Sequence, residues 1–205
     1  MNINTISFLR NKKQLNQYTD IACSLKKTIP SISNSEYPLK IDSCGSFIAV
    51  STNKELWQVD FFSKIKTKIT TNSLNQISSH GEAFIGLINP TTILISDGKR
   101  SDKMSFITKI SSLSLLKSKN NIYALLGEEE GIFTVVDIEI GKTVFHYRCG
   151  DKPLSFIEKC EKNSTILCSS SKGPLFIFKY QTKYDDYEFQ YIGRHNNSIF
   201  PSGEI

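Results

Sequence analysis

The chain has 205 residues, of which 39% are hydrophobic and 22% are charged, and its formal net charge is +5. This is an ordinary composition for a soluble protein. The chain is long enough for one sizeable core or two small ones, and a single domain is the default expectation. No run approaches the roughly 18 apolar residues of a membrane-spanning helix, and the mild positive charge permits an RNA or acidic partner without requiring one.

Residues 1–36 form an N-terminal basic segment, in which five basic and two acidic residues supply +3 of the net charge. Its first cations, Arg10, Lys12 and Lys13, follow a short apolar stretch rather than precede it, which is the wrong order for a secretory signal. The stretches TISFLRN and DIACSLKKTIP are interpreted as two outer strands, and residues 8–18 as a place for a short helix.

Four segments then repeat one pattern, an apolar run with one small residue, a polar turn and a second apolar run: SFIAVSTNKELWQVD, AFIGLINPTTILISD, NIYALLGEEEGIFTVVD and TILCSSSKGPLFIFK. The small residues Ala49, Gly86, Ala124 and Cys168 are 37, 38 and 44 positions apart, and each run ends 11 or 13 positions after its small residue. This nearly constant interval is typical of a repeat protein, and missing such a repeat would mis-assign the whole fold.

Between the units lie shorter segments rich in β-branched and aromatic residues, so each unit is predicted to contain four short strands. They are YPLKID, SKIKTKITT, NSLNQIS, MSFITKIS, SLSLLKS, KTVFHYRC, PLSFIEK and YEFQYIG. A period of about 40 residues with four strands predicts an all-β fold, a β-propeller or partial propeller of four-stranded antiparallel blades. The near-continuous apolar runs suit blades covered on both faces. A β-sandwich is the rival fold, but it does not predict the constant interval.

Residues 37–193 resemble divergent WD repeats, because Val59-Asp60, Val136-Asp137 and the weaker Ser96-Asp97 stand where that family has its Trp-Asp dipeptide. The four repeats give four complete blades, fewer than the roughly seven common in that family, and the resemblance implies a scaffold that mediates protein–protein interactions within an intracellular complex. It leaves open a fifth, composite blade built from residues 1–36 and the C-terminal segment 194–205, which otherwise is a tail. If the ends do not join, a partner protein is expected to cover the exposed edges and complete the propeller.

The expected contact surfaces are the turns within the repeats, residues 53–55, 89–92, 127–131 and 171–174, which are predicted to lie on one face. The candidate partner-binding residues are Asn53, Lys54, Glu55, Glu128, Glu129, Glu130 and Lys172. The three consecutive glutamates are expected to form an exposed acidic tip that attracts a basic peptide or, in the alternative we favour, is a solvated turn.

The second candidate surface is basic. Lys64, Lys66 and Lys68, here called the lysine stripe, alternate with other residues and so share one side of a strand. With Lys99 and Arg100, and Lys103 in the same loop, they are the candidate nucleic-acid contacts of an RNA-associated assembly factor, as in ribosome biogenesis or RNA processing. The alternative is an outer strand protected by lysines against edge pairing.

Catalytic and metal-binding patterns are not found in the sequence. The histidines His80, His146 and His195 are widely spaced, and neither a nucleophile elbow nor a glycine-rich phosphate loop occurs. Five cysteines without a C-x-x-C pair indicate a reducing compartment, and Cys160 and Cys168, the two that paired strands can bring together, lack further metal ligands. We therefore expect a non-enzymatic protein, cytoplasmic or nuclear, without cofactor, metal or small-molecule substrate.

Overall fold

The structure is a computed structural model that describes residues 38–44, 47–60, 66–70, 74, 76–80, 83–96, 101–184 and 186–196. Contacts divide the chain into Met1–Tyr37 and Pro38–Ile205, and every described residue belongs to the second unit. The strands and helix predicted within residues 1–36 and the C-terminal strand of the composite blade lie outside the described residues. The composite blade therefore stays a prediction.

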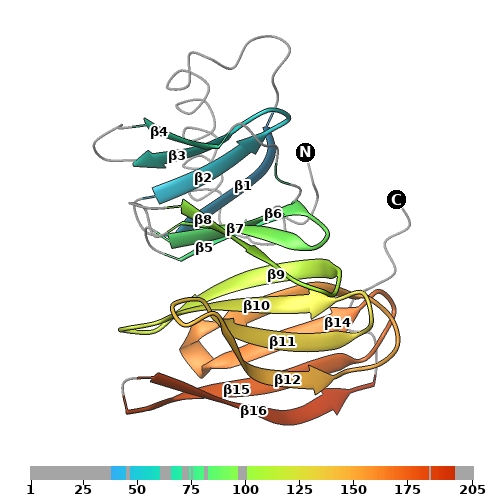
Figure 1. The fold of residues 1–205 in the computed structure, drawn as a ribbon. Coiled ribbons are helices and arrows are strands. Elements are labelled where there is room, and N and C mark those ends of the chain that lie inside the picture. Colours follow the sequence, from blue (N-terminus) through green and yellow to red (C-terminus); the bar gives the residue numbers. More distant parts are fainter. Residues whose placement is uncertain are drawn as a thin grey trace, which may run out of the picture. The chain divides into compact units, whose positions relative to one another are not determined.

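Four antiparallel sheets of four strands each make up the described part of the chain (Figure 1). The first contains β1 (Pro38–Cys44), β2 (Phe47–Thr52), β3 (Leu56–Asp60) and β4 (Lys66–Thr70). The second contains β5 (Gln76–His80), β6 (Ala83–Asn89), β7 (Thr92–Ser96) and β8 (Ser101–Ser105). The third contains β9 (Ile110–Lys117), β10 (Ile122–Glu128), β11 (Ile132–Asp137) and β12 (Lys142–Arg148). The fourth contains β13 (Leu154–Cys160), a 3-10 turn η2 (Glu161–Asn163), β14 (Thr165–Ser170), β15 (Leu175–Lys183) and β16 (Asp186–His195).

Each sheet is a meander in which neighbouring strands follow one another in the chain, as the four-strand repeat predicted. One predicted strand is displaced. The segment MSFITKIS was expected to be a single strand, but β8 ends at Ser105 and residues 106–109 form a loop. The displacement has a local cause, because the Phe106 and Ile110 amides donate to the carbonyls of Thr91 and Pro90, at 2.8 and 2.6 Å, and hold the loop against the preceding turn.

The first strands of successive sheets pack against one another, β1 on β5, β5 on β9 and β9 on β13. Hydrogen bonds connect them. Ser79 Oγ donates to Asp42 Oδ2 at 3.0 Å, the Leu115 amide donates to Ser78 Oγ at 3.0 Å, and Ser112 Oγ donates to the Leu154 carbonyl at 2.5 Å. These partners are 37, 37 and 42 positions apart, which is the spacing of the repeat. The sheets are therefore related in the way that the blades of a propeller are.

The apolar runs are continuous because each middle sheet is buried on both faces. In β6, Ile85 and Leu87 pack into a core shared with the third sheet, whereas Phe84 packs with Leu56 of the first. In β10 the alternation is repeated, with Ile122, Ala124 and Leu126 in the core shared with the second sheet and Tyr123 and Leu125 in the core shared with the fourth. A strand with two buried faces loses the polar alternation of a one-sided sheet.

The small residues of the repeat have equivalent places. Ala124 in β10 and Cys168 in β14 both face the preceding sheet, each pairs with the first strand of its own sheet, and both are fully buried. A Cβ added at Gly86 in β6 would lie 2.3 Å from Leu74 Cδ1, a member of the core shared with the first sheet. In the second, third and fourth sheets the small residue therefore lies on the side that packs toward the preceding sheet.

Aromatic side chains join the third and fourth sheets. Phe133 and Phe178 have ring centroids 4.6 Å apart in the core, and Tyr147 and Tyr191 stack at 4.4 Å with an interplanar angle of 16°. Tyr147 lies in β12 and Tyr191 in β16, so these contacts reach the outer strands of both sheets. Aromatic pairs stabilise a fold by more than their buried area alone provides, and these pairs stabilise the packing of the two sheets away from the inner strands.

Candidate interaction surface

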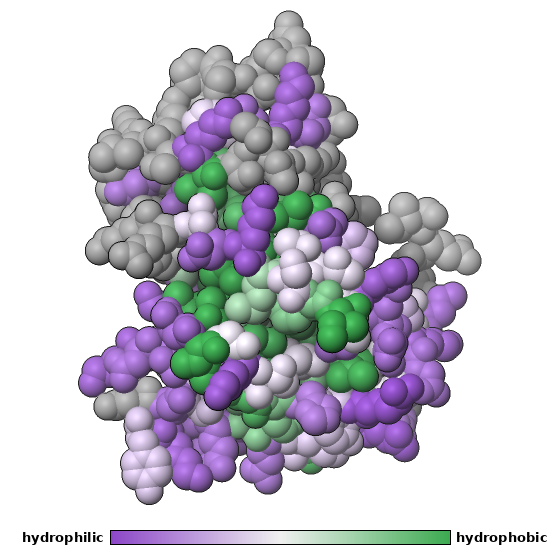
Figure 2. Space-filling view, in the orientation of Figure 1, coloured by the Kyte–Doolittle hydropathy of each residue, from purple (hydrophilic) through white to green (hydrophobic). Residues whose placement is uncertain are grey.

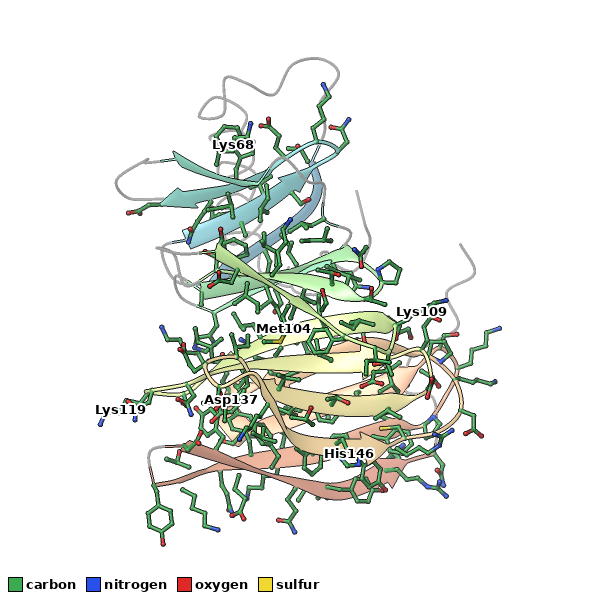
Figure 3. All side chains as sticks on the ribbon, viewed as in Figure 1. Lys68, Met104, Lys109, Lys119, Asp137 and His146 are labelled. Atoms are coloured by element: carbon green, nitrogen blue, oxygen red, sulfur yellow. The ribbon has the colours of Figure 1, made fainter. Side chains whose placement is uncertain are left out.

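The turns between the second and third strands lie at one end of the sheets. Gln76 and Ser78 of β5 bond to Ser111 and Leu115 of β9, so these two inner strands run in the same direction. The hydrogen bonds between β9 and β13 show that these two strands also run in the same direction. The turns 89–92, 127–131 and 171–174 therefore lie at the same end of their sheets. Lys109, beside these turns, and Lys119, in the turn between β9 and β10, lie at opposite ends of the third sheet (Figure 3).

Backbone hydrogen bonds connect these turns into one surface. The loop 106–109 is bound to the turn 89–92, and the Glu129 amide donates to the Lys109 carbonyl at 2.8 Å. The Cys149 amide then donates to the Gly131 carbonyl at 2.9 Å, which adds the loop 149–153 that leads into the fourth sheet. We call the residues 89–92, 106–109, 129–131 and 149–153 the turn surface. It is continuous across three sheets.

Internal hydrogen bonds also hold the individual turns. Asn89 Oδ1 accepts from the Thr91 amide at 2.9 Å, and Thr52 Oγ1 accepts from the Glu55 amide at 2.9 Å in the corresponding turn of the first sheet. The Gly173 amide donates to the Ser170 carbonyl at 3.0 Å in the fourth. Loops that are positioned by a rigid scaffold are where binding residues are commonly found.

Glu128 corrects the expectation of an acidic tip with three exposed carboxylates. It ends β10 as a buried residue, 7% exposed, and its carboxylate accepts a hydrogen bond of 2.5 Å from Thr134 Oγ1 across the hairpin. A buried carboxylate needs such a partner because desolvation disfavours its charge. The exposed acidic residues of this turn are Glu129, which pairs with Lys109 at 3.5 Å, and Glu130.

The predicted partner-binding residues of the other turns have different surroundings. Lys54 and Lys172 are exposed, and Asn53 is half-buried between β2 and β3. Glu55 is paired, because its Oε1 lies 2.5 Å from Lys68 Nζ, with 19% and 41% of the two side chains exposed. A residue predicted to bind proteins and one predicted to bind nucleic acid thus bind each other.

The predicted nucleic-acid contacts are only partly described. Lys66 and Lys68 lie in β4, the edge strand of the first sheet, which is the outer position expected for a lysine-protected strand. Lys68 Nζ also lies 6.0 Å from the centre of the Trp57 ring. Lys64, Lys99 and Arg100 lie outside the described residues. Lys103, expected in a loop, belongs to β8.

The opposite end of the inner strands brings together three titratable side chains that the sequence did not connect. Lys159 Nζ lies 2.9 Å from His80 Nδ1 and donates to the Leu115 carbonyl at 2.7 Å, while Glu161 Oε1 lies 3.2 Å from His80 Nδ1. An ammonium group only donates, so the contact with Lys159 requires Nδ1 to accept, whereas the Glu161 carboxylate accepts only from a protonated Nδ1; the tautomer of His80 decides which of the two contacts is a hydrogen bond. These contacts join the second, third and fourth sheets.

The electrostatics at this end follow from burial. Desolvation, and then the charge of Lys159, lower the pKa of His80 below its ordinary value of 6.5. A cavity of about 260 Å³ lies beside His80, and burial raises the pKa of Tyr180 in its wall to about 12. Lys159 and Glu161 are 79 and 81 positions from His80 in the chain, so no local sequence motif predicts that they meet.

Asp137, which stands in the place of the Asp of a WD dipeptide, has a structural role. It is 2% exposed, and one carboxylate oxygen accepts from the amides of Glu139 and Ile140 at 2.9 and 3.3 Å. The other oxygen accepts from Asn121 Nδ2 at 3.1 Å. Asp137 therefore orders the turn after β11 and ties it to the residue that precedes β10.

The cysteine pair differs from the one expected. Cys160 pairs with Thr165 across its hairpin, and Cys168 with Ile157, so the two thiols do not meet there. Instead Cys168 Sγ lies 3.7 Å from Cys149 Sγ, in the loop that follows β12. Among the described residues, no group of three or more histidine, cysteine, aspartate or glutamate side chains is arranged to hold a metal ion.

Comparison with solved structures supports the fold. A chain of the Mitotic Checkpoint Complex is similar with a TM-score of 0.55 and 12% identity, over 71% of this chain and 50% of that one. The Cps50 (Swd1) beta-propeller domain of Myceliophteria thermophila has a TM-score of 0.60 and 6% identity, over 79% and 59% of the two chains. Apo AztD from Citrobacter koseri has a TM-score of 0.58 and 14% identity, over 78% and 47%.

These likenesses show the fold alone, since the identities are low. The chain matches no protein-family model and no curated protein sequence. It spans about half the length of the solved chains that it resembles. The predicted fold class is confirmed, an all-β propeller or partial propeller of four-stranded antiparallel blades, and the sandwich alternative is wrong. No helix in the described ranges is long and apolar enough to cross a membrane.

Proposed function

We propose that the chain is a non-enzymatic scaffold that binds other proteins through the turn surface, within a cytoplasmic or nuclear complex. The observation that carries the proposal is the line of backbone hydrogen bonds that fixes turn 89–92, loop 106–109, turn 129–131 and loop 149–153 against one another. A surface already ordered in this way loses little conformational entropy when a partner binds.

The chemistry of the turn surface suits a protein partner. Ile107 is fully exposed at the tip of its loop, where it provides an apolar anchor. The turn surface and its border also carry charges of both signs, including the Lys109–Glu129 pair and Arg148, whose guanidinium lies 2.8 Å from Asp151. Figure 2 shows hydrophilic residues gathered at both ends of the third and fourth sheets, with apolar residues between them. An apolar anchor within a polar rim is typical of protein interfaces.

A scaffold explains the titratable cluster better than an enzyme does. His80, Lys159 and Glu161 are bound to one another and to a backbone carbonyl, so each side chain already has a structural partner. The solved Mitotic Checkpoint Complex is an assembly that contains a chain of this fold. From it we take only the expectation that stable protein partners exist for this chain too.

The test is affinity purification of the full-length chain from its native cell, with quantitative mass spectrometry of the partners. Ile107→Asp places a charge on the apolar anchor, and Ile140→Asp is its matched control, because Ile140 is 61% exposed in the turn after β11, at the other end of the third sheet. We expect a stoichiometric partner with the wild type and with Ile140→Asp. Ile107→Asp should recover it at least about tenfold less well, which corresponds to about 1.4 kcal/mol.

Two results would contradict the proposal. Equal recovery of the partner by both variants would move the binding site away from the turn surface. A wild-type chain that is recovered alone and turns over a metabolite in a screen of the purified protein would replace the scaffold by an enzyme.

A further inference from the structure

We infer that Cys149 and Cys168 are a site of oxidative modification, at which a peroxide converts the two thiols into a disulfide that joins the third sheet to the fourth. The inference rests on position, because the two Sγ atoms lie 3.7 Å apart and belong to different sheets. A disulfide requires about 2.0 Å between the sulfurs. The remaining approach is therefore short, and one of the two residues lies in a loop.

The two cysteines are held differently. Cys168 is fully buried in β14, between Ile157 of β13 and Phe176 of β15, and its side chain faces the third sheet. Cys149 is partly exposed, and its amide is bound to the Gly131 carbonyl. It is the first residue beyond β12. An oxidant therefore reaches the partly exposed Cys149 first, whereas Cys168 is buried and held in β14.

The chemistry proceeds in two balanced steps. The Cys149 thiolate attacks one oxygen of hydrogen peroxide, the O–O bond breaks, and a sulfenic acid and one water result after proton transfer. The Cys168 sulfur then attacks the Cys149 sulfur, the S–O bond breaks, and a second water leaves with the two protons. Two thiols are oxidised to one disulfide, and one peroxide is reduced to two waters.

The order of attack agrees with the electrostatics. The hydrogen bond with Cys149, burial and the charge of a Cys149 thiolate all raise the pKa of the Cys168 thiol above its ordinary value. Cys168 is therefore a poor first nucleophile. Once Cys149 has become a neutral sulfenic acid, the repulsion from its thiolate is gone, and the second step is favoured by proximity.

The repeat itself creates this site. Cys168 occupies the position of the small residue that the other units fill with alanine or glycine, and in the third and fourth sheets this position faces the preceding sheet. The preceding sheet supplies Cys149 from the loop 149–153, which is part of the turn surface. A disulfide here would restrain that loop covalently, independently of whether the turn surface binds a partner.

The experiment uses the full-length chain, reduced and then treated with hydrogen peroxide under native conditions. We expect the intact mass to fall by two hydrogens. Trypsin separates the cysteines, because it does not cleave between Lys152 and Pro153: peptide 149–159 contains Cys149, peptide 160–162 contains Cys160 and peptide 163–172 contains Cys168. The expected product links 149–159 to 163–172.

The variants make the result specific. Cys160→Ser is the matched control and should form the same linked peptide, whereas Cys149→Ser should not form it. The melting temperature should rise on oxidation of the wild type and of Cys160→Ser, and stay unchanged in Cys149→Ser. A link through Cys160, or Cys149 carried to a sulfinic acid with Cys168 still reduced, would overturn the inference.

Discussion

Gly127 in β10 lies against Leu154 of the fourth sheet, and Gly127→Ala is a direct probe of how the sheets dock. A Cβ added there would lie 2.3 Å from Ser112 Oγ, 2.8 Å from Leu154 Cβ and 3.0 Å from the Leu154 carbonyl oxygen. Ser111 Oγ and Ser112 Oγ both donate to that carbonyl, which holds it in place. The new methyl group therefore pushes against backbone, and the two sheets must separate.

The magnitude follows from opposing contributions. Overpacking of a well-packed core costs about 1–3 kcal/mol. Loss of a hydrogen bond from Ser112 would add roughly 1 kcal/mol to this cost. Alanine also lowers the conformational entropy of the unfolded chain, which offsets the cost by about 0.4–1 kcal/mol. We expect a net loss of about 1–3 kcal/mol. For a chain of this size, each kcal/mol lowers the melting temperature by about 2–4 °C.

Urea unfolding, followed by circular dichroism, measures the change through its midpoint. The matched control is Gly193→Ala in β16, because a Cβ there meets nothing within 4 Å, and this variant should be as stable as the wild type. If Gly127→Ala unfolds at the same urea concentration as Gly193→Ala, the third and fourth sheets are not docked as closely as described here. An unchanged slope with denaturant would show that the shift of the midpoint is a change in stability and that the surface exposed on unfolding is the same.

Four further substitutions test the structure. Asp137→Ala should lower the free energy of unfolding by about 1–3 kcal/mol in urea, because it removes the three hydrogen bonds that the buried carboxylate accepts; an unchanged free energy of unfolding would contradict its structural role. The pKa of His80 is lowered by burial and Lys159, so the stability it contributes is full above the ordinary pKa of 6.5 and is lost as pH falls through its lower folded value. His80→Gln should flatten the acid side of a plot of urea midpoint against pH, and an identical slope in both proteins would refute this. Lys68→Gln breaks an exposed pair with Glu55 and should change stability by less than about 1 kcal/mol. If the RNA alternative were correct, replacing the lysine stripe by glutamine would weaken RNA binding and reduce its dependence on salt; salt-insensitive or undetectable RNA binding would remove that alternative.

The fold could be predicted from the sequence because the same pattern of strands and turns is repeated four times. One blade alone is ambiguous between helix, strand and loop at its boundaries, but a constant interval between Ala49, Gly86, Ala124 and Cys168 and the ends of their units reflects one packing requirement met repeatedly. The displaced strand at residues 104–111 shows the limit of this reasoning. Its residue types favour a strand throughout, but hydrogen bonds to the turn 89–92 end β8 at Ser105.

The candidate surface was only partly accessible. The turns could be placed, since Gly, Pro and Asn interrupt the apolar runs at fixed points, but the exposure of each residue could not. In the sequence, Glu128 is indistinguishable from Glu129 and Glu130. Only the register of the hairpin determines that Thr134 donates a hydrogen bond to the buried Glu128 while the other two glutamates are exposed. The pairing of Glu55 with Lys68 likewise depends on register across β3 and β4.

By itself, the sequence determined the local periodicity, the strand order within each sheet and the need for a small residue once per unit, because these depend on neighbours within about 40 positions. Only the tertiary structure decided which distant groups meet. The contacts of His80 with Lys159, of Ser112 with Leu154 and of Cys149 with Cys168 each join different sheets, and they exist because the sheets pack against one another. Side-chain chemistry between sheets follows from that packing, and no pattern within a single repeat contains it.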